Sequence, residues 1–231
     1  MNWSWLLPPA ASTFAPDIDR MYYVILAITG VVFFVTEILL VWFLVRYRHR
    51  EGRKAEYVHG NTTAEIVWTA VPFVIVLGIA LASRGVWAEI KDPASVPPDA
   101  MEVLITAKQF EWNTTYPGAD GVLETADDHT ARNSLDIPVH RPVRVTLRSE
   151  DVIHSFFLPA MRVKQDVVPG MQNFVWFEAT ETGEFTIGCA ELCGIGHTRM
   201  RGQLTVHTED DYRRWLAEEQ AGVSSNGAGA P

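Results

Sequence analysis

Two long apolar segments near the start of the chain predict helices that cross a membrane. Tyr22–Val45 is apolar apart from three polar residues, and Ile66–Ser83 is apolar over a shorter length. An α-helix needs about 20 apolar residues to cross the hydrocarbon core, and neither segment alternates as a membrane β-strand would. We therefore expect transmembrane helices at residues 21–46 and 65–85, joined by a loop at 47–64.

From about Met101 the pattern changes to short segments that are rich in β-branched and aromatic residues and separated by Pro, Gly and Asp turns. These segments predict strands at residues 101–112, 143–149, 173–179, 184–190 and 202–208. Such a series favours an antiparallel all-β sandwich or barrel. Residues 116–139 are rich in turn residues, and we expect an insertion too polar for a core. Residues 209–220 predict a short C-terminal helix, and 224–231 a flexible tail.

The charge is distributed unevenly along the chain. Residues 1–85 hold 7 Lys/Arg and 6 Asp/Glu, whereas residues 86–231 hold 12 and 22, which together give the net charge of −9. The overall composition, with 48% hydrophobic residues and only two cysteines, excludes a disordered chain, a collagen-like fibre and a disulfide-rich miniprotein. The protein is therefore expected to be a membrane-anchored chain with an acidic soluble domain, without a nucleic-acid partner.

The loop between the two spans is basic, since residues 46–54 (RYRHREGRK) contain five Lys/Arg. Basic loops stay in the cytoplasm, so both termini are expected outside. The sequence thus predicts a protein of the bacterial inner (cytoplasmic) membrane with three extracytoplasmic parts: an N-terminal segment (1–20), a β-domain (86–208) and a C-terminal helix with its tail (209–231).

Several acids stand out against this pattern. Glu37 lies inside the first span, where a carboxylate is costly unless it faces protein or water, so we expect it to face a helix of a partner subunit. Glu65 begins the second span, either as a first-turn carboxylate favoured by the helix dipole or in a functional role. Asp120, Asp127 and Asp128 offer ligands for a cation in the insertion, although a solvated loop is the favoured interpretation.

The strongest chemical signal is the segment Cys189-Ala-Glu-Leu-Cys193-Gly-Ile-Gly-His197-Thr-Arg-Met200, which contains both cysteines of the chain. A disulfide would leave the histidine and methionine unexplained, and zinc has little use for a thioether. Copper takes thiolate, imidazole and thioether ligands, and a second thiolate in the loop indicates a binuclear copper centre. The second imidazole must come from elsewhere; His154, at the end of a strand in DVIHSF, is the candidate.

In this order, the two helices, the basic loop, the aromatic strand, DVIHSF, KQDVVPG and CAELCGIGHTRM resemble subunit 2 of the haem–copper cytochrome c oxidases over nearly the full length. The resemblance implies a cupredoxin-type barrel that holds a binuclear CuA centre. The ligands it implies are bridging sulfurs from Cys189 and Cys193, then His154 and Met200 on one copper, and His197 and the backbone carbonyl of Glu191 on the other.

The same resemblance implies roles outside the copper centre. The Glu191 side chain is expected at a magnesium site shared with subunit 1, Asp166 near that interface, and Glu65 at the mouth of a proton pathway. The implied partners are subunit 1, which holds the haem, subunit 3, membrane lipid, and a c-type cytochrome or equivalent electron donor. The chain has no CxxCH motif of its own, so an external donor is needed.

The aromatic strand departs from the family, which often has Gln-Trp-aromatic-Trp where this chain has Gln109-Phe110-Glu111-Trp112. In the family, electrons enter at the first Trp of this motif. Trp112 and Phe110 are therefore weak candidates for the point at which electrons enter, with barrel packing or a surface position as the alternative.

These features together favour a subunit that passes electrons from a c-type cytochrome through CuA to subunit 1, where oxygen is reduced to water with proton translocation. The copper subunit of a nitric oxide reductase would share the ligand loop, and a membrane-tethered copper-binding or chaperone module is a non-enzyme alternative. The acidic domain would attract a cationic donor, or its charge would serve solubility alone.

Overall fold

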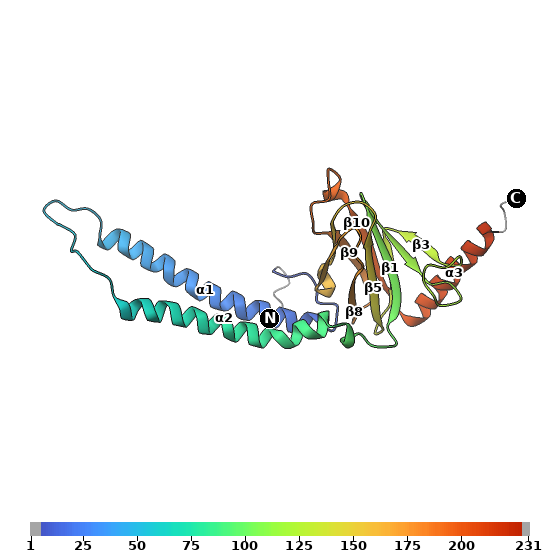
Figure 1. Cartoon of the computed structure of the whole chain (residues 1–231), viewed down its shortest axis with the longest axis horizontal. Helices are drawn as coiled ribbons and strands as arrows, with labels where there is room; N and C mark the ends of the chain where they lie inside the picture. Colours follow the sequence, from blue (N-terminus) through green and yellow to red (C-terminus); the bar gives the residue numbers. More distant parts are fainter. Residues whose placement is uncertain (1–5, 228–231) are drawn as a thin grey trace. The chain divides into compact units, whose positions relative to one another are not determined.

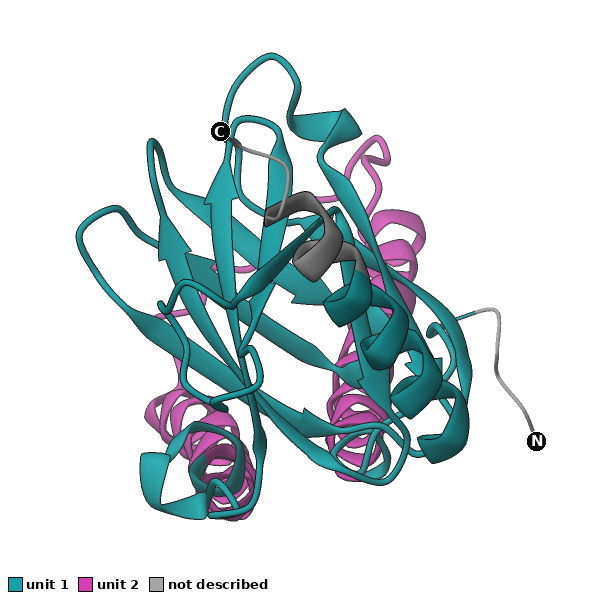
Figure 2. Cartoon of the chain, turned by 90° about the vertical axis from the view of Figure 1, so that its right-hand side faces the viewer, with its two compact units in different colours: residues 1–16, 88–231 teal, residues 17–87 magenta. Residues whose placement is uncertain are grey.

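The computed structural model describes residues 6–227. It divides into two compact units: residues 17–87 form one, and residues 1–16 together with 88–231 form the other (Figure 2).

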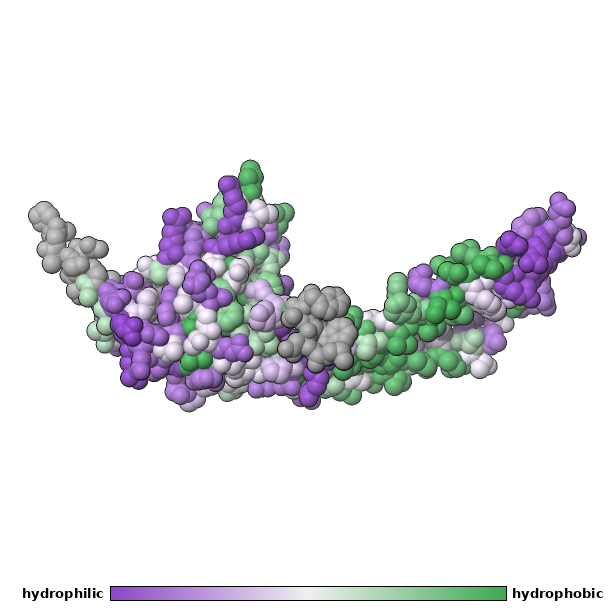
Figure 3. Space-filling view, turned by 180° about the vertical axis from the view of Figure 1, so that it is seen from behind, coloured by the Kyte–Doolittle hydropathy of each residue, from purple (hydrophilic) through white to green (hydrophobic). Residues whose placement is uncertain are grey.

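The first unit is a helical hairpin made of α1 (Ala15–Arg46) and α2 (Thr62–Lys91), which run in opposite directions (Figure 1). Both helices are long and apolar enough to cross a membrane, and apolar residues cover their surface in Figure 3, whereas the connecting loop is hydrophilic. The helices satisfy polar groups locally, since the hydroxyls of Thr29 and Thr36 donate to the carbonyls of Ile25 and Val32 four residues earlier. Each helix is longer than the span predicted from its apolar residues.

The described part of the second unit contains ten strands. They are β1 (Met101–Lys108), β2 (Glu111–Tyr116), β3 (His129–Arg132), β4 (Ser134–Pro138), β5 (Pro142–Ser149), β6 (His154–Leu158), β7 (Val163–Val167), β8 (Asn173–Glu178), β9 (Gly183–Cys189) and β10 (Arg201–His207). They form two five-stranded sheets, β3-β2-β1-β5-β8 and β4-β10-β9-β6-β7. The expectation of a purely antiparallel domain is wrong, because each sheet contains one parallel pair, β1 with β5 and β4 with β10. Inward side chains such as Phe156, Phe177 and Leu147 are fully buried. The predicted fold class, a two-helix hairpin followed by an all-β cupredoxin-like domain and a short C-terminal helix, is confirmed.

The expectation of a wholly polar insertion at 116–139 is wrong at its C-terminal end. Residues 129–138 form β3 and β4, and Leu135 and Ile137 on β4 are fully buried. β4 pairs in parallel with β10, with Leu204 opposite Leu135. A strand whose partner lies almost seventy positions later in the chain leaves little local sequence signal, so the turn residues before it dominated the prediction.

The segment before α1 is part of the β-domain unit. Ser12 forms a β-bridge with Ala179, and its hydroxyl donates to the carbonyl of Met161 at 2.7 Å. Ala11 and Phe14 are buried beside it. The residues that lead into the first helix are therefore fixed to the barrel.

The chain closes with α3 (Glu209–Gly227), which packs aromatic side chains on the barrel. Trp215 lies edge-on to Tyr116, and Tyr212 is buried. The helix continues through the first residues of the predicted tail; residues 228–231 of that tail lie outside the described residues.

Candidate metal centre

The sequence-predicted ligands meet at one end of the sheet β4-β10-β9-β6-β7. The expectation that His154 ends the preceding strand is wrong, because β5 ends at Ser149 and His154 begins β6. Cys189 ends β9, and the loop from 190 to 200 leads into β10 at the upper end of these strands in Figure 1. β6 and β9 are antiparallel, with Phe156 opposite Cys189, so the start of one strand lies beside the end of the other. Pairing within one sheet thus brings together ligands from distant parts of the sequence.

Two sulfurs and an imidazole form the centre of the cluster. Each of Cys189, Cys193 and His154 offers a ligand atom within 4.8 Å of the others. The sulfurs are 3.8 Å apart, well beyond the roughly 2.05 Å of a disulfide, and both cysteines are free. The disulfide interpretation therefore does not describe this arrangement.

The remaining predicted ligands complete the same cluster. His197 places Nδ1 3.6 Å from the Cys193 sulfur, and the Met200 sulfur lies 3.7 Å from it. The carbonyl oxygen of Glu191 lies 3.2 Å from the Cys189 sulfur, while the Glu191 side chain belongs to an exposed residue. Thiolate, imidazole, thioether and carbonyl donors are thus grouped in a largely buried site.

The electrostatics of the two sulfurs differ. Burial of Cys189 opposes its ionisation, but the adjacent His154 imidazole and the backbone of Ser155 lower the pKa of its thiol to about 6. Burial and the adjacent Cys189 raise the pKa of the Cys193 thiol to about 11. Two thiolates this close repel each other, so the second ionises readily only beside a compensating positive charge. This arrangement suits a cationic ligand.

Asp151 is a residue of the site that the sequence analysis did not single out. Its Oδ1 lies 2.8 Å from Nε2 of the fully buried His154. Burial of His154 opposes its protonation, but its contacts with Cys189 and Asp151 raise the pKa of the imidazole. A carboxylate on one ring nitrogen of a histidine fixes the ring and leaves the other nitrogen for a metal. The signal was present, since Asp151 stands at the start of the quoted motif DVIHSF.

The two aromatic candidates for electron entry differ in burial: Trp112 is fully buried and Phe110 is half-buried. Trp112 is fully buried, with its ring centroid 6.0 Å from that of His154 and 5.5 Å from that of Phe156. This is the barrel packing that the sequence left open, and no part of the Trp112 ring reaches solvent. Phe110 is half-buried and covers the ligand loop, because a Cβ on Gly196 would overlap its ring.

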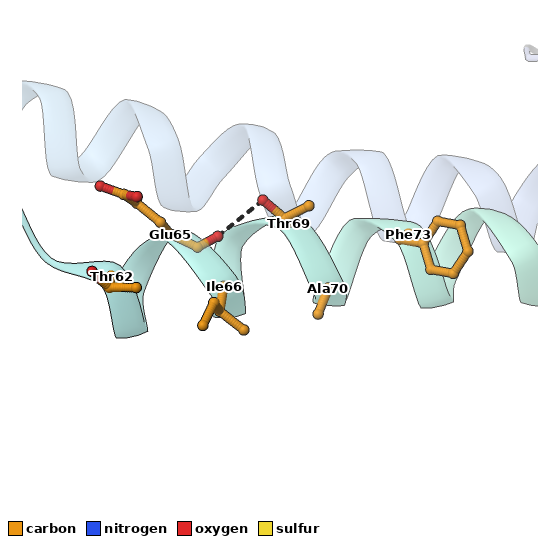
Figure 4. Close-up of a pocket in the computed structure, with 6 residues that line it drawn as sticks. All are labelled: Thr62, Glu65, Ile66, Thr69, Ala70 and Phe73. Carbon is orange, nitrogen blue, oxygen red and sulfur yellow. Dashed lines mark hydrogen bonds between the residues drawn. The ribbon is translucent and has the colours of Figure 1, made fainter.

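Glu65 lies in the other unit, in the first turn of α2. It lines an open depression with Thr62, Ile66, Thr69, Ala70 and Phe73 (Figure 4). Its carbonyl accepts a hydrogen bond from the Thr69 hydroxyl at 2.9 Å. Glu37, in the middle of α1, is exposed on the helix surface. These two acids are available to neighbours rather than buried within this chain.

The other acidic candidates have local hydrogen-bond partners. Asp166, on β7, accepts a hydrogen bond at 2.8 Å from the hydroxyl of Ser155, which follows His154 in the sequence. In the acidic loop, Asp127 accepts from the Thr125 hydroxyl and Asp128 from the Glu124 amide. These contacts are those of a solvated turn whose carboxylates bind its own backbone and hydroxyls.

Comparison with known proteins gives a consistent result over most of the chain. Residues 1–86 match the family described as cytochrome c oxidase subunit II, transmembrane domain, and residues 104–206 match its periplasmic domain. The alternative cytochrome c oxidase subunit 2 of Bradyrhizobium diazoefficiens is 35% identical over 97% of this chain and 88% of its own length. Cytochrome c oxidase subunit 2 of Thermostichus vulcanus is 30% identical over 94% of this chain and 79% of its own length. The crystal structure of the periplasmic domain of subunit II of cytochrome oxidase of Bradyrhizobium japonicum has a TM-score of 0.47 and 31% identity, and it covers 55% of this chain and 99% of that one.

Proposed function

Because the chain belongs to the family of cytochrome c oxidase subunit II and has two membrane spans, we propose that it is the electron-accepting subunit of a respiratory terminal oxidase. A c-type cytochrome delivers electrons to a CuA centre in the β-domain, and they continue to haem in subunit 1. Oxygen is reduced to water in subunit 1, with proton translocation. The observation that carries this proposal is the convergence of two unbonded sulfurs, two imidazoles and a thioether at one end of the barrel.

The residues present fit a pair of copper ions. Soft thiolates, imidazoles and a thioether are the donors that copper prefers. The Nδ1 atom of His154 is buried without a hydrogen-bond partner, and the adjacent sulfurs of Cys189 and Cys193 need a compensating positive charge. A bound metal ion would supply that charge, and the imidazole nitrogen would donate its lone pair to it. Both features have a physical reason if the site holds metal.

In this proposal the sulfurs of Cys189 and Cys193 would hold the copper pair, together with His154 and Met200 on one side and His197 and the Glu191 carbonyl on the other. When bound, the copper pair supplies a one-electron carrier. The chain keeps the ligands in place before and after electron transfer, because His154 and Met200 are almost completely buried and Asp151 fixes the His154 ring.

Other residues connect the chain to its partners. The exposed side chain of Glu191 is proposed to bind magnesium shared with subunit 1, and the exposed Asp166 to lie near the same interface. Glu65 is proposed at the mouth of a proton pathway in subunit 1, and Glu37 against a helix of a neighbouring subunit, either subunit 1 or subunit 3. Both acids are exposed within this chain, as such contacts require.

We also propose that the β-domain lies on the extracytoplasmic side of a bacterial inner membrane. The N-terminal segment is bonded into the barrel through Ser12, so both lie on the same side of the membrane. Two spans then place the basic loop on the opposite face, which the positive-inside rule assigns to the cytoplasm. The excess of acids after residue 86 would attract a cationic donor, and rising ionic strength should slow that association.

The full chain, purified in detergent and loaded with copper, tests the proposal. It should bind two copper ions, turn purple and give a seven-line EPR pattern. Cys193→Ser should lose this pattern and Met200→Leu should alter it, whereas Met171→Leu, at an exposed methionine, should leave it unchanged. A colourless chain that prefers zinc would refute the proposal.

A further inference from the structure

Gln109 touches both parts of the chain that carry the proposed copper ligands, although it carries no ligand itself. It lies in the turn between β1 and β2. Its backbone N–H donates to Oδ2 of Asp151 at 2.7 Å, 42 positions away. Its side-chain Nε2 donates to the carbonyl of Cys193 at 2.5 Å, 84 positions away. One residue therefore connects two segments that are far apart in the sequence.

On the first side, Gln109 acts on His154 through Asp151. Oδ2 of the Asp151 carboxylate accepts a hydrogen bond from the backbone N–H of Gln109, and Oδ1 pairs with Nε2 of His154. Two partners on different oxygens fix the plane of the carboxylate. A fixed carboxylate in turn fixes the direction in which the imidazole ring presents its other nitrogen.

On the second side, Gln109 holds the ligand loop directly. The bond to the Cys193 carbonyl restrains the peptide unit that follows the cysteine. The next residue, Gly194, has φ of +132°, and a Cβ there would come within 2.7 Å of Nε2 of Gln109. The side chain therefore lies close against the loop backbone, and Gly194 is suited to this approach both by its conformation and by its lack of a side chain.

We propose that Gln109 is a positioning residue of the metal centre, which sets the loop that carries Cys193 and His197 relative to the strand that carries His154. This inference deepens the proposed function and depends on it for the identity of the metal. A loop that shifts relative to His154 would move Cys193 and His197 away from the other donor atoms that would hold the metal. Partners of this kind typically alter metal affinity by about 10- to 100-fold when they are removed.

The test substitutes Gln109→Met in the full chain in detergent. Methionine has a similar length and no donor, and the backbone N–H to Asp151 remains, so the substitution isolates the bond to the Cys193 carbonyl. We expect copper to be lost to a chelator about 10-fold faster or more, with altered hyperfine splitting in the EPR spectrum. Gln203→Met, at an exposed position of β10, is the matched control and should leave both unchanged.

The metal-free chain gives a second readout that does not depend on copper. Oxidised glutathione can close a disulfide between Cys189 and Cys193 by thiol–disulfide exchange, which requires the sulfurs to move from 3.8 Å to about 2.05 Å. Gln109→Met should free the loop and speed closure several-fold relative to Gln203→Met. If Gln109→Met does not fold, Gln109→Asn, whose amide is one methylene too short for the carbonyl, takes its place with a smaller expected change.

The two proposals fail in different ways. Wild-type values of copper loss, hyperfine splitting and disulfide closure in a folded Gln109 variant would overturn the positioning role. A wild-type chain that binds no copper would overturn the proposed function, while the closure rates would still decide whether Gln109 positions the loop.

Discussion

Apolar side chains face opposite ways in the two units of this chain. In the helical hairpin, large apolar side chains are exposed along both spans, and no residue of α2 is buried. In the β-domain, Phe156, Phe177 and Leu135 are fully buried. The residue types are the same, so the difference lies in what covers them: each sheet of the barrel is covered by the other, whereas the apolar surface of the hairpin is exposed within this chain, as in a membrane span.

This contrast explains where chemistry is built within the chain. A metal site needs ligands held by their surroundings, and the β-domain supplies a packed interior that surrounds His154 and Met200. The hairpin carries the acids Glu65 and Glu37 on its exposed surface, where no other residue of the described chain encloses them. In the proposed function, the barrel would therefore hold a site built from its own residues, and the helix acids would belong to sites completed by neighbouring subunits.

The largest effect on stability is expected when a buried and an exposed phenylalanine are each replaced by alanine. Phe156→Ala removes a fully buried ring that packs against Trp112, and it should destabilise the β-domain by about 3–5 kcal/mol. Phe33→Ala removes a ring that is 56% exposed on α1, where it leaves no cavity, and it should change stability by less than about 1 kcal/mol. Thermal unfolding of the full chain in detergent measures both. Equal losses would mean that the hairpin has an internal core after all.

Sequence patterns predicted this contrast well where the signal is local. The apolar length of Tyr22–Val45 and Ile66–Ser83 is sufficient to indicate membrane spans, and β-branched and aromatic segments indicate five of the ten strands in the described residues, namely β1, β5, β8, β9 and β10. The other strands, β2 beyond its first two residues, β3, β4, β6 and β7, were not predicted. The buried strand β4 was missed because Leu135 and Ile137 follow a long turn-rich segment. Its place in the core is set by parallel pairing with β10, which no local pattern reveals.

The candidate site divides in the same way. Cys189, Cys193, His197 and Met200 fall within twelve consecutive residues, so their chemistry is evident from the sequence. Residues that support the ligands from other strands are not, because Gln109 reaches the loop only through the packing of two sheets. The sequence thus identifies donor atoms, and the fold identifies what holds them.

A charge placed on each exposed surface sharpens the comparison. Val31 on α1 is 65% exposed and Val122, in the loop between β2 and β3, is 56% exposed, so their exposed fractions do not distinguish the two surfaces. Val31→Arg should cost about 2.5–3.5 kcal/mol of membrane insertion, because its surroundings are lipid or an apolar partner. Val122→Arg, in a loop of the β-domain, should leave membrane insertion unchanged and lower the free energy of unfolding by less than about 0.5 kcal/mol. The fraction of chain that resists carbonate extraction from membranes measures the difference, and similar retention of both variants would contradict the assignment of α1 to lipid.

The smallest effect tests the point where one unit leads into the other. Ser12 precedes α1 but belongs to the β-domain, where it is 2% exposed and donates to the Met161 carbonyl. Ser12→Ala leaves that carbonyl without its partner and should cost about 1 kcal/mol, a fall of about 2–4 °C in the unfolding midpoint. Thr13→Ala, one residue later and exposed, is the control and should lower the midpoint by at most about 1–2 °C by the same conversion, since surface changes are usually within about 0.5 kcal/mol. If both variants unfold as the wild type does, the N-terminal segment is not fixed to the barrel, and the argument that places both on one side of the membrane loses its structural support.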